Sequence, residues 1–187
     1  MRIISGKFKG KKLIQPVDKC TRPLKDLTKE SIFNLLVHSK FIKFNFNEID
    51  VLDLFSGSGS FGIECLSRNV KSVTFVENYK PAIKILKKNI NSISSKNNFE
   101  FFENNIYNKN NKLNFKKKFD LIFADPPYEE KRINELLSII LNFDYLKKNG
   151  VLILHRNKKN EDIITKKLKV FEERIYGKSK IIFLGLY

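Results

Sequence analysis

The sequence lacks the long apolar stretches that membrane proteins need. No run of apolar residues approaches the about 20 positions that a membrane-spanning helix requires. The first residues, MRIISGKFKGKKLIQP, are interrupted by lysines too early to form the apolar region of a signal peptide. We therefore expect a protein that stays in the cytoplasm and has no contact with a membrane.

Cysteine is also scarce. The 187 residues include two cysteines, Cys20 and Cys65, which do not form a CxxC pair and have no histidine nearby. This spacing argues against a metal site and against a framework of disulfides. We expect two free thiols and no bound metal.

Negative charge is in short supply as well. The chain has 36 lysine and arginine residues against 20 aspartate and glutamate residues, which gives a net charge of +16. Such an excess favours a polyanionic partner, because lysines that neutralise phosphates release bound counterions. An AT-rich genome would produce the same composition, since its codons favour lysine and asparagine. The segment GKFKGKK favours nucleic acid, because it groups basic residues around glycines and a phenylalanine.

Strand and helix patterns alternate along most of the chain. The predicted strands are DVLDLF, SVTFVE, FEFFENN, FDLIFAD and GVLILHR, and the predicted helices are KDLTKESIFNLLVHS, FGIECLSRN, KPAIKILKKNINSIS, RINELLSIILNFDYL and the start of EDIITKKLKVF. The first 16 residues are typical of a short β-hairpin, and the last 17 predict a hairpin that turns at Gly177 and Lys178. We predict an α/β fold of Rossmann-like type. Its mainly parallel seven-stranded sheet has helices on both faces and a C-terminal antiparallel hairpin.

A glycine-rich turn follows the first predicted central strand and favours a nucleoside cofactor. Gly57, Gly59 and Gly62 match GxGxxG between a strand and a helix. Glu77 ends the next strand near the spacing expected for a ligand of ribose hydroxyls. Asp53 bears on the choice of cofactor, because a carboxylate beside this turn repels a pyrophosphate. S-adenosylmethionine carries an ammonium and a sulfonium and no phosphate, so it is favoured over NAD.

The stretch FDLIFADPPY ends a later strand at the same predicted edge of the sheet. Pro126 and Pro127 fix φ near about −65° and have no amide protons, so the loop is stiff and offers carbonyl oxygens. Asp125 and the carbonyl of Pro126 are suited to accept both N–H groups of an exocyclic amine and to aim its lone pair at a donated methyl. Tyr128 is suited to stack on a flipped-out base. Whether Asp125 takes the released proton or only orients the amine stays open.

The motifs LDLFSGSGSFGIECLSR, VTFVE and FADPPY resemble class I S-adenosylmethionine-dependent methyltransferases that modify exocyclic amines. The flanks MRIISGKFKGKKL, TRPLKDLTKESIFNLL and RIYGKSKIIFLGLY resemble the bacterial RsmD family, almost from end to end. This resemblance implies methylation of the N2 amine of guanine in 16S rRNA, at position 966 of the usual rRNA numbering. It implies a 30S ribosomal particle, assembled or in assembly, as the partner, and we expect a monomer.

The resemblance also implies roles for individual residues. The cofactor site would comprise Asp53, Phe55, Gly57, Ser58 and Gly59, with Glu77 on the ribose and Asn105 near the adenine. The guanine would be held by Asp125, Pro126, Pro127 and Tyr128. For RNA we expect contacts from Arg2, Lys7, Lys9, Lys11, Lys12 and Arg22. Residues 1–48 would then be a basic hairpin and helix that cover the cofactor and contact RNA, and residues 49–187 the methyltransferase domain.

The chain departs from the family pattern at two places. Leu24, Lys25 and Lys29 stand where the family usually has a threonine and arginines, so bidentate phosphate contacts are lost there. His155 and Arg156 replace an acidic residue that is common in relatives, and we assign His155 no catalytic role. Two other functions stay open, an adenine methyltransferase with the same site and an RNA-binding protein without catalysis. An NAD-dependent oxidoreductase is a more remote third.

Overall fold

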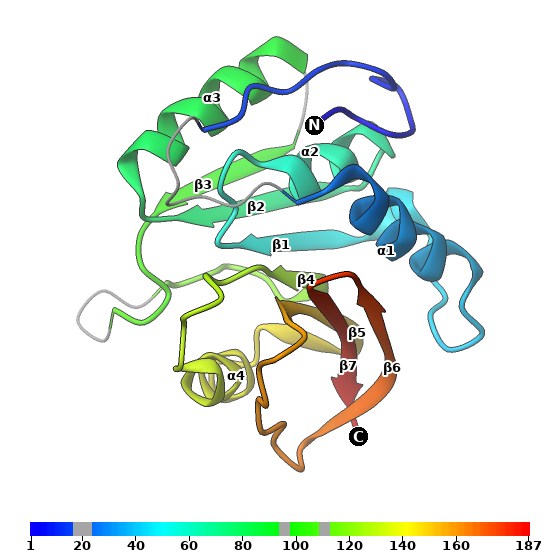
Figure 1. Ribbon diagram of the computed structural model, residues 1–187, viewed down its shortest axis with the longest axis vertical. Coiled ribbons are helices and arrows are strands. Elements are labelled where there is room, and N and C mark those ends of the chain that lie inside the picture. Colours follow the sequence, from blue (N-terminus) through cyan, green and yellow to red (C-terminus); the bar gives the residue numbers. More distant parts are fainter. Residues whose placement is uncertain (17–23, 94–97, 109–112) are drawn as a thin grey trace.

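A seven-stranded sheet forms the centre of the computed structural model, which describes residues 1–16, 24–93, 98–108 and 113–187 (Figure 1). The strands lie in the order β3-β2-β1-β4-β5-β7-β6. They are β1 (Asp50–Leu54), β2 (Ser72–Glu77), β3 (Phe99–Glu103), β4 (Phe119–Ala124), β5 (Leu146–Asn157), β6 (Leu168–Tyr176) and β7 (Ser179–Leu186). All neighbours pair in parallel except β7, which is antiparallel to β5 and β6. The predicted sheet and its C-terminal hairpin are confirmed.

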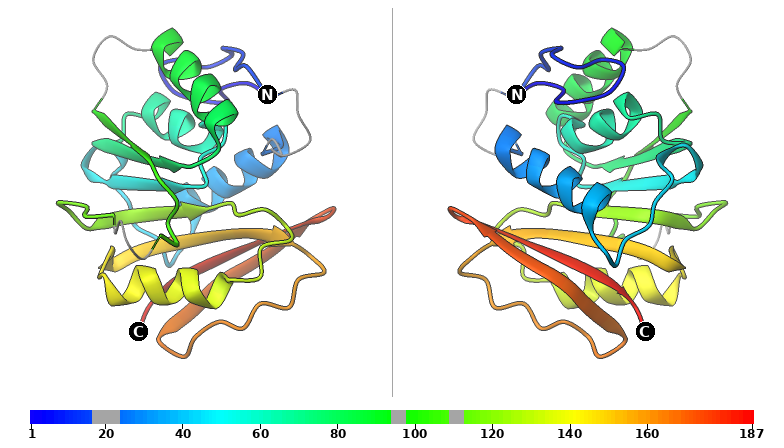
Figure 2. Two further views of the ribbon diagram at one scale, coloured as in Figure 1. Left: turned by 90° about the vertical axis from the view of Figure 1, so that its left-hand side faces the viewer. Right: turned by 90° about the vertical axis from the view of Figure 1, so that its right-hand side faces the viewer.

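Helices cover both faces of this sheet, as predicted (Figure 2). They are α1 (Asp26–His38), α2 (Ser60–Ser67), α3 (Lys80–Ile93) and α4 (Ile133–Asn142), with a 3-10 turn at Phe46–Glu48. Side chains alternate across each strand, so β4 sends Leu121 and Phe123 to the cluster under α1, α2 and α3, and Ile122 to the cluster under α4. Both faces of the central strands are therefore buried, which explains their continuous apolar sequences.

The helix predicted to start in EDIITKKLKVF is wrong. Residues 158–167 form turns and irregular chain, and β6 begins at Leu168. A short helix needs an apolar face that packs against the core, but Ile163 remains 75% exposed. The β-branched residues Val170 and Ile175 suit the strand that forms instead, because it pairs along its length with β7.

The N-terminal hairpin is confirmed as an antiparallel turn, but it has no regular strands. An isolated bridge joins Arg2 and Lys12, and backbone hydrogen bonds pair Ile3 with Lys11 at 2.9 Å and with Gly10 at 2.8 Å. The next backbone N–H groups, of Ile4 and Ser5, donate to the carboxylate of Glu64 in α2, at 2.7 and 2.9 Å. Because a side chain of α2 accepts from these donors, the pairing stops after Ile3 and the tip of the hairpin is irregular.

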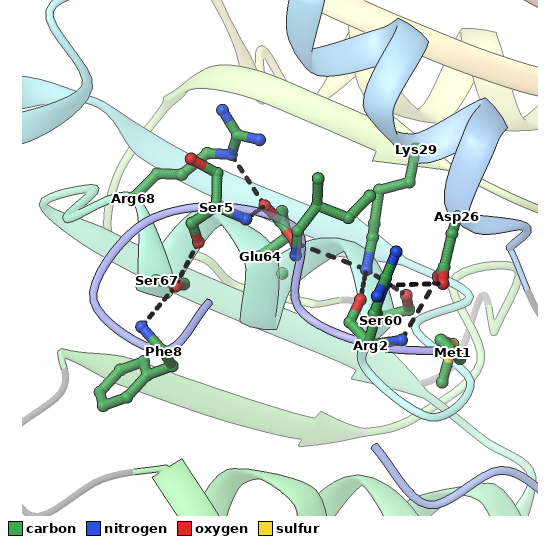
Figure 3. Close-up of polar contacts among 12 residues, drawn as sticks. Met1, Arg2, Ser5, Phe8, Asp26, Lys29, Ser60, Glu64, Ser67 and Arg68 are labelled. Carbon is green, nitrogen blue, oxygen red and sulfur yellow. Dashed lines mark hydrogen bonds and ion pairs between the residues drawn. The ribbon is translucent and has the colours of Figure 1, made fainter. Parts of the chain in front are cut away.

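A buried ion pair holds this segment to two helices (Figure 3). Lys29 of α1 and Glu64 of α2 are both fully buried, with Nζ 3.4 Å from Oε2. Nζ of Lys29 also donates to the carbonyl of Arg2 at 2.8 Å and to Oγ of Ser60 at 3.2 Å, and Nε of Arg68 donates to Glu64 at 3.0 Å. Burial lowers the pKa of Lys29, against the opposing effect of Glu64. Lys29 is therefore an interior residue and is not available to contact RNA.

Candidate active site

A cavity of about 420 Å³ opens at the carboxyl ends of β1, β2 and β4. The ends of neighbouring parallel strands share one edge of the sheet, so motifs far apart in the sequence meet there. The predicted residues that line the cavity are Asp53, Phe55, Gly57, Ser58, Glu77, Asp125, Pro126, Pro127 and Tyr128. The structure therefore brings the glycine-rich turn and the DPPY loop to one site.

An aromatic stack forms one wall of the cavity. The ring of Phe33 in α1 stacks on Phe61 in α2, with centroids 5.2 Å apart, and Phe61 stacks on Phe123 in β4 at 4.0 Å. Phe61 and Phe123 both line the cavity. The stack links two helices to the central strand, so it fixes the position of the glycine-rich turn relative to the DPPY loop.

Gly59 and Asn105, which the sequence also placed at the cofactor, lie beside the cavity. Gly59 precedes α2 with φ +82°, and a Cβ there would come within 2.2 Å of Cδ1 of Leu86. Its role in the structure is to allow this tight turn. Asn105 lines a small adjoining hollow together with Phe55 and Glu77, which also line the main cavity.

The carboxylate of Glu77 is held by three backbone N–H groups. Oε2 accepts from Gly57 at 2.8 Å, and Oε1 accepts from Asn78 and Tyr79 at 2.9 Å each. Gly57 has φ +56°, a conformation that favours glycine. These bonds fix the orientation of the carboxylate, and each oxygen keeps further acceptor capacity for a hydroxyl group of a ligand.

Asp53 is a buried acid at the cavity, with 1% of its surface exposed. Its Oδ2 accepts the N–H of Gly62 at 3.0 Å. A Cβ on Gly62 would lie 2.3 Å from the ring of Phe75 and 2.9 Å from Oδ2 of Asp53, so this approach requires glycine. Burial raises the pKa of Asp53 well above its ordinary value, the Gly62 bond opposes this, and the charges of Asp125 and Glu77 add to it. A cation in the cavity would therefore stabilise the ionised form.

The cavity has the opposite charge to the rest of the protein. Its lining includes Asp53, Glu77, Asp125 and Glu129, and no lysine or arginine from the described part of the chain. The cavity is therefore acidic although the whole chain has a net charge of +16. Four carboxyl groups disfavour a ligand that carries phosphates and favour a cationic one. The charge of the site therefore fits a cationic ligand that carries no phosphate.

The DPPY loop is anchored by a histidine that the sequence interpretation left without a role. Nδ1 of His155 lies 2.9 Å from Oδ1 of Asp125, and His155 is 2% exposed. The ring of Tyr128 meets the His155 ring edge-on, with centroids 6.1 Å apart, and its hydroxyl lies 3.3 Å from Oγ of Ser179. His155 is not part of the cavity lining. It therefore acts through Asp125 and Tyr128, whose side chains it orients.

Arg156 is a second residue whose role the sequence did not show. It is 1% exposed and forms a bidentate pair with Asp162, at 2.9 and 3.2 Å. Its guanidinium also donates to the carbonyls of Pro127 at 3.0 Å and Glu130 at 2.7 Å. One buried side chain thus ties the loop that follows Asp125 to the segment after β5. The only sequence signal was a histidine followed by an arginine at the end of an apolar strand.

The predicted RNA-binding residues are not all at the cavity: Arg2 shares the Lys29 ammonium with Ser60 of the lining, whereas Lys7 and Lys11 lie further away. Those described, Arg2, Lys7, Lys9, Lys11 and Lys12, are all exposed. The N–H of Lys7 bonds to Ser67 at the end of α2, and the ammonium of Lys11 donates to Ser92 near the end of α3. Both helices begin near the cavity, so these lysines lie at their far ends, about 12 Å away along α2. Arg22 lies outside the described residues.

Other predicted features concern membranes, metals and thiols. Across the described ranges, no helix is long and apolar enough to cross a membrane. In the same part of the chain, no group of three histidine, cysteine, aspartate or glutamate side chains is arranged to hold a metal ion. Cys65 is a buried free thiol, and Cys20 lies outside the residues that the structure describes.

The fold and the cavity define a Rossmann-like methyltransferase. The crystal structure of the putative methylase HI0767 from Haemophilus influenzae is similar to this chain with a TM-score of 0.77 and 28% identity, over 98% of this chain and 96% of that one. The chain belongs to the family described as Conserved hypothetical protein 95, the RsmD family, whose profile matches residues 1–185.

Curated relatives agree with this membership. Ribosomal RNA small subunit methyltransferase D of Buchnera aphidicola subsp. Acyrthosiphon pisum is 32% identical over 182 residues, which cover 92% of this chain and 86% of the relative. Putative rRNA methyltransferase YlbH of Bacillus subtilis is 33% identical over 162 residues, which cover 86% of this chain and 85% of the relative. The resemblance seen in the sequence motifs is confirmed over nearly the whole chain.

Proposed function

We propose that this protein methylates the N2 amine of a guanine in 16S rRNA, at position 966 by resemblance, with S-adenosylmethionine as the methyl donor. One observation carries the proposal. A single cavity joins the acidic residues Asp53 and Glu77, beside the glycine-rich turn, to the loop that carries Asp125, Pro126 and Tyr128. Relatives named as rRNA methyltransferases support an rRNA substrate.

The residues of the cavity suit S-adenosylmethionine in charge and shape. This cofactor supplies an electrophilic methyl group and carries an ammonium and a sulfonium. Glu77, fixed by three N–H bonds, would accept the ribose hydroxyls, and Asn105 would lie near the adenine. Asp53 would face the cationic end, where a positive charge offsets the cost of its burial. Phe55, Gly57, Ser58 and Gly59 would complete the site by their positions in the glycine-rich turn.

The DPPY loop would hold the amine and its base. Asp125 and the carbonyl of Pro126 would accept the two N–H groups, which leaves the nitrogen lone pair directed into the cavity. Tyr128 would stack on the base. The carbonyl of Pro127 accepts a hydrogen bond from the guanidinium of Arg156. His155 holds the carboxylate of Asp125 in place at 2.9 Å. The proton that the amine loses would pass to Asp125 or to water.

We further propose a division of labour along the chain. Residues 1–48 would form an extension that covers the cofactor and contacts RNA, and residues 49–187 the methyltransferase domain. The exposed side chains of Arg2, Lys7, Lys9, Lys11 and Lys12 would contact the RNA backbone away from the target base. The protein would act in the cytoplasm as a monomer, on assembled or assembling 30S particles.

Methyl transfer to 30S subunits that lack the modification tests the proposal. Labelled S-adenosylmethionine, nucleoside digestion and chromatography should place the label in N2-methylguanosine. Label in N6-methyladenosine would show an adenine methyltransferase instead. Binding of the cofactor and RNA without any transfer would show a non-catalytic RNA-binding protein, and calorimetry with NAD would detect an oxidoreductase.

Cofactor affinity should rise with pH because of Asp53. Its pKa is raised in the free protein, and a cationic ligand binds the ionised form better, so affinity increases as the pH rises through that pKa. Asp53→Asn should remove this dependence and, at a pH above the pKa of Asp53, lower the affinity about 10- to 100-fold, the effect of losing a charged hydrogen bond. Calorimetric titration from pH 5 to pH 8 measures both.

The same substitution should stabilise the free protein at neutral pH. In the wild type the folded state holds the Asp53 proton more tightly than the unfolded state, so stability falls as pH rises from the ordinary aspartate pKa towards the raised one. Asparagine does not ionise, so the stability of Asp53→Asn does not fall for this reason as the pH rises. Thermal unfolding of both proteins over this pH range checks the sign, and a less stable Asp53→Asn protein at neutral pH would contradict the assignment.

Arg156→Lys should lower kcat about tenfold while cofactor affinity stays within a factor of two. An ammonium has one charge centre, so it is unable to hold Asp162 and the carbonyls of Pro127 and Glu130 together. The loop then loses its fixed position, to which catalysis is sensitive. Steady-state methyl transfer and cofactor titration separate the two quantities. An unchanged kcat would show that the loop is rigid without Arg156.

A further inference from the structure

A group of exposed lysines lies beside the cavity, on two turns that the sequence interpretation did not assign to RNA. Its members are Lys158, Lys159 and Lys178, called here the lysine rim. The first two follow the carboxyl end of β5, and the third lies in the turn between β6 and β7, at the end of the hairpin far from the C-terminus (Figure 1). The N–H of Lys158 donates to the carbonyl of Lys178 at 2.9 Å, so the two turns lie side by side.

Both turns contact the tyrosine that would stack on the target base. Nδ2 of Asn160 donates to the carbonyl of Tyr128 at 3.2 Å, and Oγ of Ser179 lies 3.3 Å from the Tyr128 hydroxyl. Nζ of Lys180 donates to the carbonyl of Asn160 at 2.6 Å and links the two turns again. The lysine rim is therefore adjacent to the part of the cavity that Tyr128 lines, whereas Lys7 and Lys11 are held near the far ends of α2 and α3.

The positive charge of the lysine rim is not neutralised locally. Among the residues that the structure describes, none of its three ammonium groups forms an ion pair. Two nearby carboxylates are already engaged, Asp162 with Arg156 and Glu130 with Arg132. Glu161 is the exposed acid of the turn after β5, so a surplus of positive charge remains.

Three lysines at the opposite edge of the sheet differ from the lysine rim, because they form ion pairs within the protein. Lys71, Lys117 and Lys147, near the amino ends of the strands, all lie within 3.9 Å of the Asp50 carboxylate. These ammonium groups are paired with a carboxylate of the protein itself. The lysine rim has no such partner, which leaves it available to an anionic ligand.

We propose that the lysine rim binds the backbone phosphates of the nucleotides that flank the methylated base. This inference rests on the proposed function, because it takes the occupant of the cavity to be an RNA base. The acidic cavity repels phosphates and the lysine rim beside it attracts them. When a base enters the cavity past Tyr128, the sugar-phosphate backbone on either side of it stays outside the cavity. There its phosphates would contact the lysine rim. Such contacts help to offset the cost of unstacking the base.

The test compares two triple variants with the same change of charge. The first is Lys158→Gln/Lys159→Gln/Lys178→Gln, which keeps the bond between the turns because that bond joins backbone atoms. The matched control is Lys166→Gln/Lys167→Gln/Lys169→Gln, which alters exposed lysines at the start of β6. The control site lies about nine residues from the turn along a strand, or roughly 30 Å.

Binding to 30S subunits that lack the modification is measured from 50 to 200 mM KCl, with kcat and KM for methyl transfer. The lysine rim variant should bind about 30-fold more weakly and lower the slope of log affinity against log salt by about two, since each phosphate contact contributes about 0.7. KM should rise in parallel, with kcat changed less than threefold. The control variant should stay within a factor of two of the wild type.

Equal losses in the two variants would overturn the proposal, because net charge alone would then account for binding. A lysine rim variant with weaker cofactor binding or a lower melting temperature would also overturn it, in favour of a structural role. Failure of the proposed function has a different signature, namely no N2-methylguanosine with wild-type protein. In that case the difference in salt slope between the two variants still decides whether the lysine rim binds RNA.

Discussion

Replacing Asp125 by alanine is expected to reduce kcat for methyl transfer about 100- to 1,000-fold. The variant loses the acceptor that orients the amine and the nearest group able to take its proton, and loss of either function alone accounts for an effect on the order of 100-fold. Asp125 lies on the cavity wall, and Nδ1 of His155 holds its carboxylate at 2.9 Å. Single-turnover methyl transfer to unmodified 30S subunits measures the effect.

Asp125→Asn separates the two roles that the sequence left open. Asparagine keeps one acceptor oxygen and has no basic group. If the side chain only orients the amine, Asp125→Asn should retain roughly a tenth of the wild-type rate. If it must take the proton, Asp125→Asn should be as slow as Asp125→Ala. In both variants cofactor affinity should remain within about threefold of the wild type, and an alanine variant with full activity would refute the role of this loop.

Replacing Lys29 by methionine is expected to lower the free energy of unfolding by about 3 kcal/mol. The carboxylate of Glu64 would stay fully buried with Arg68 as its remaining cation, and loss of one partner of a buried pair typically costs 3–5 kcal/mol. The carbonyl of Arg2 and the hydroxyl of Ser60 would also lose a donor. Urea unfolding monitored by circular dichroism measures the change.

Two controls accompany this variant. Lys25→Met removes an exposed lysine just before the same helix and should change stability by less than about 0.5 kcal/mol. The double variant Lys29→Met/Glu64→Gln should be more stable than Lys29→Met, because it no longer buries the Glu64 carboxylate without the Lys29 ammonium. Equal stability of Lys29→Met and Lys25→Met would show that the buried pair contributes little.

The central sheet could be predicted from the sequence because both of its faces are buried. The segment SVTFVE has the same bounds as β2. Asp53 and Glu77 lie in β1 and β2, and Asp125 directly follows β4, so all three are at the edge where the carboxyl ends of these strands meet. That geometry follows from parallel pairing alone, without side-chain detail. The cavity residues could therefore be named before their distances were known.

The anchoring residues could not be found in this way. Glu64 and Lys29 are single charges in otherwise mixed helices, and their pairing depends on how α1 crosses α2. His155 and Arg156 end a strand, where charged residues are usually solvated, yet the DPPY loop folds over them. Such contacts depend on tertiary packing, so they could not be predicted from the spacing of residues along the chain.

Residues 1–14 are synthesised before the two helices against which they pack, so they are able to dock only after those helices have been made. Their partners are Glu64 and Ser67 in α2, and Asn89 and Ser92 in α3. At 5–20 residues per second, roughly 4 to 16 s separate the synthesis of this segment from that of its last partner. Throughout that interval this basic segment of the nascent chain lacks its partners in α2 and α3. Its protection from proteolysis would therefore report, during translation, that α2 and α3 have formed.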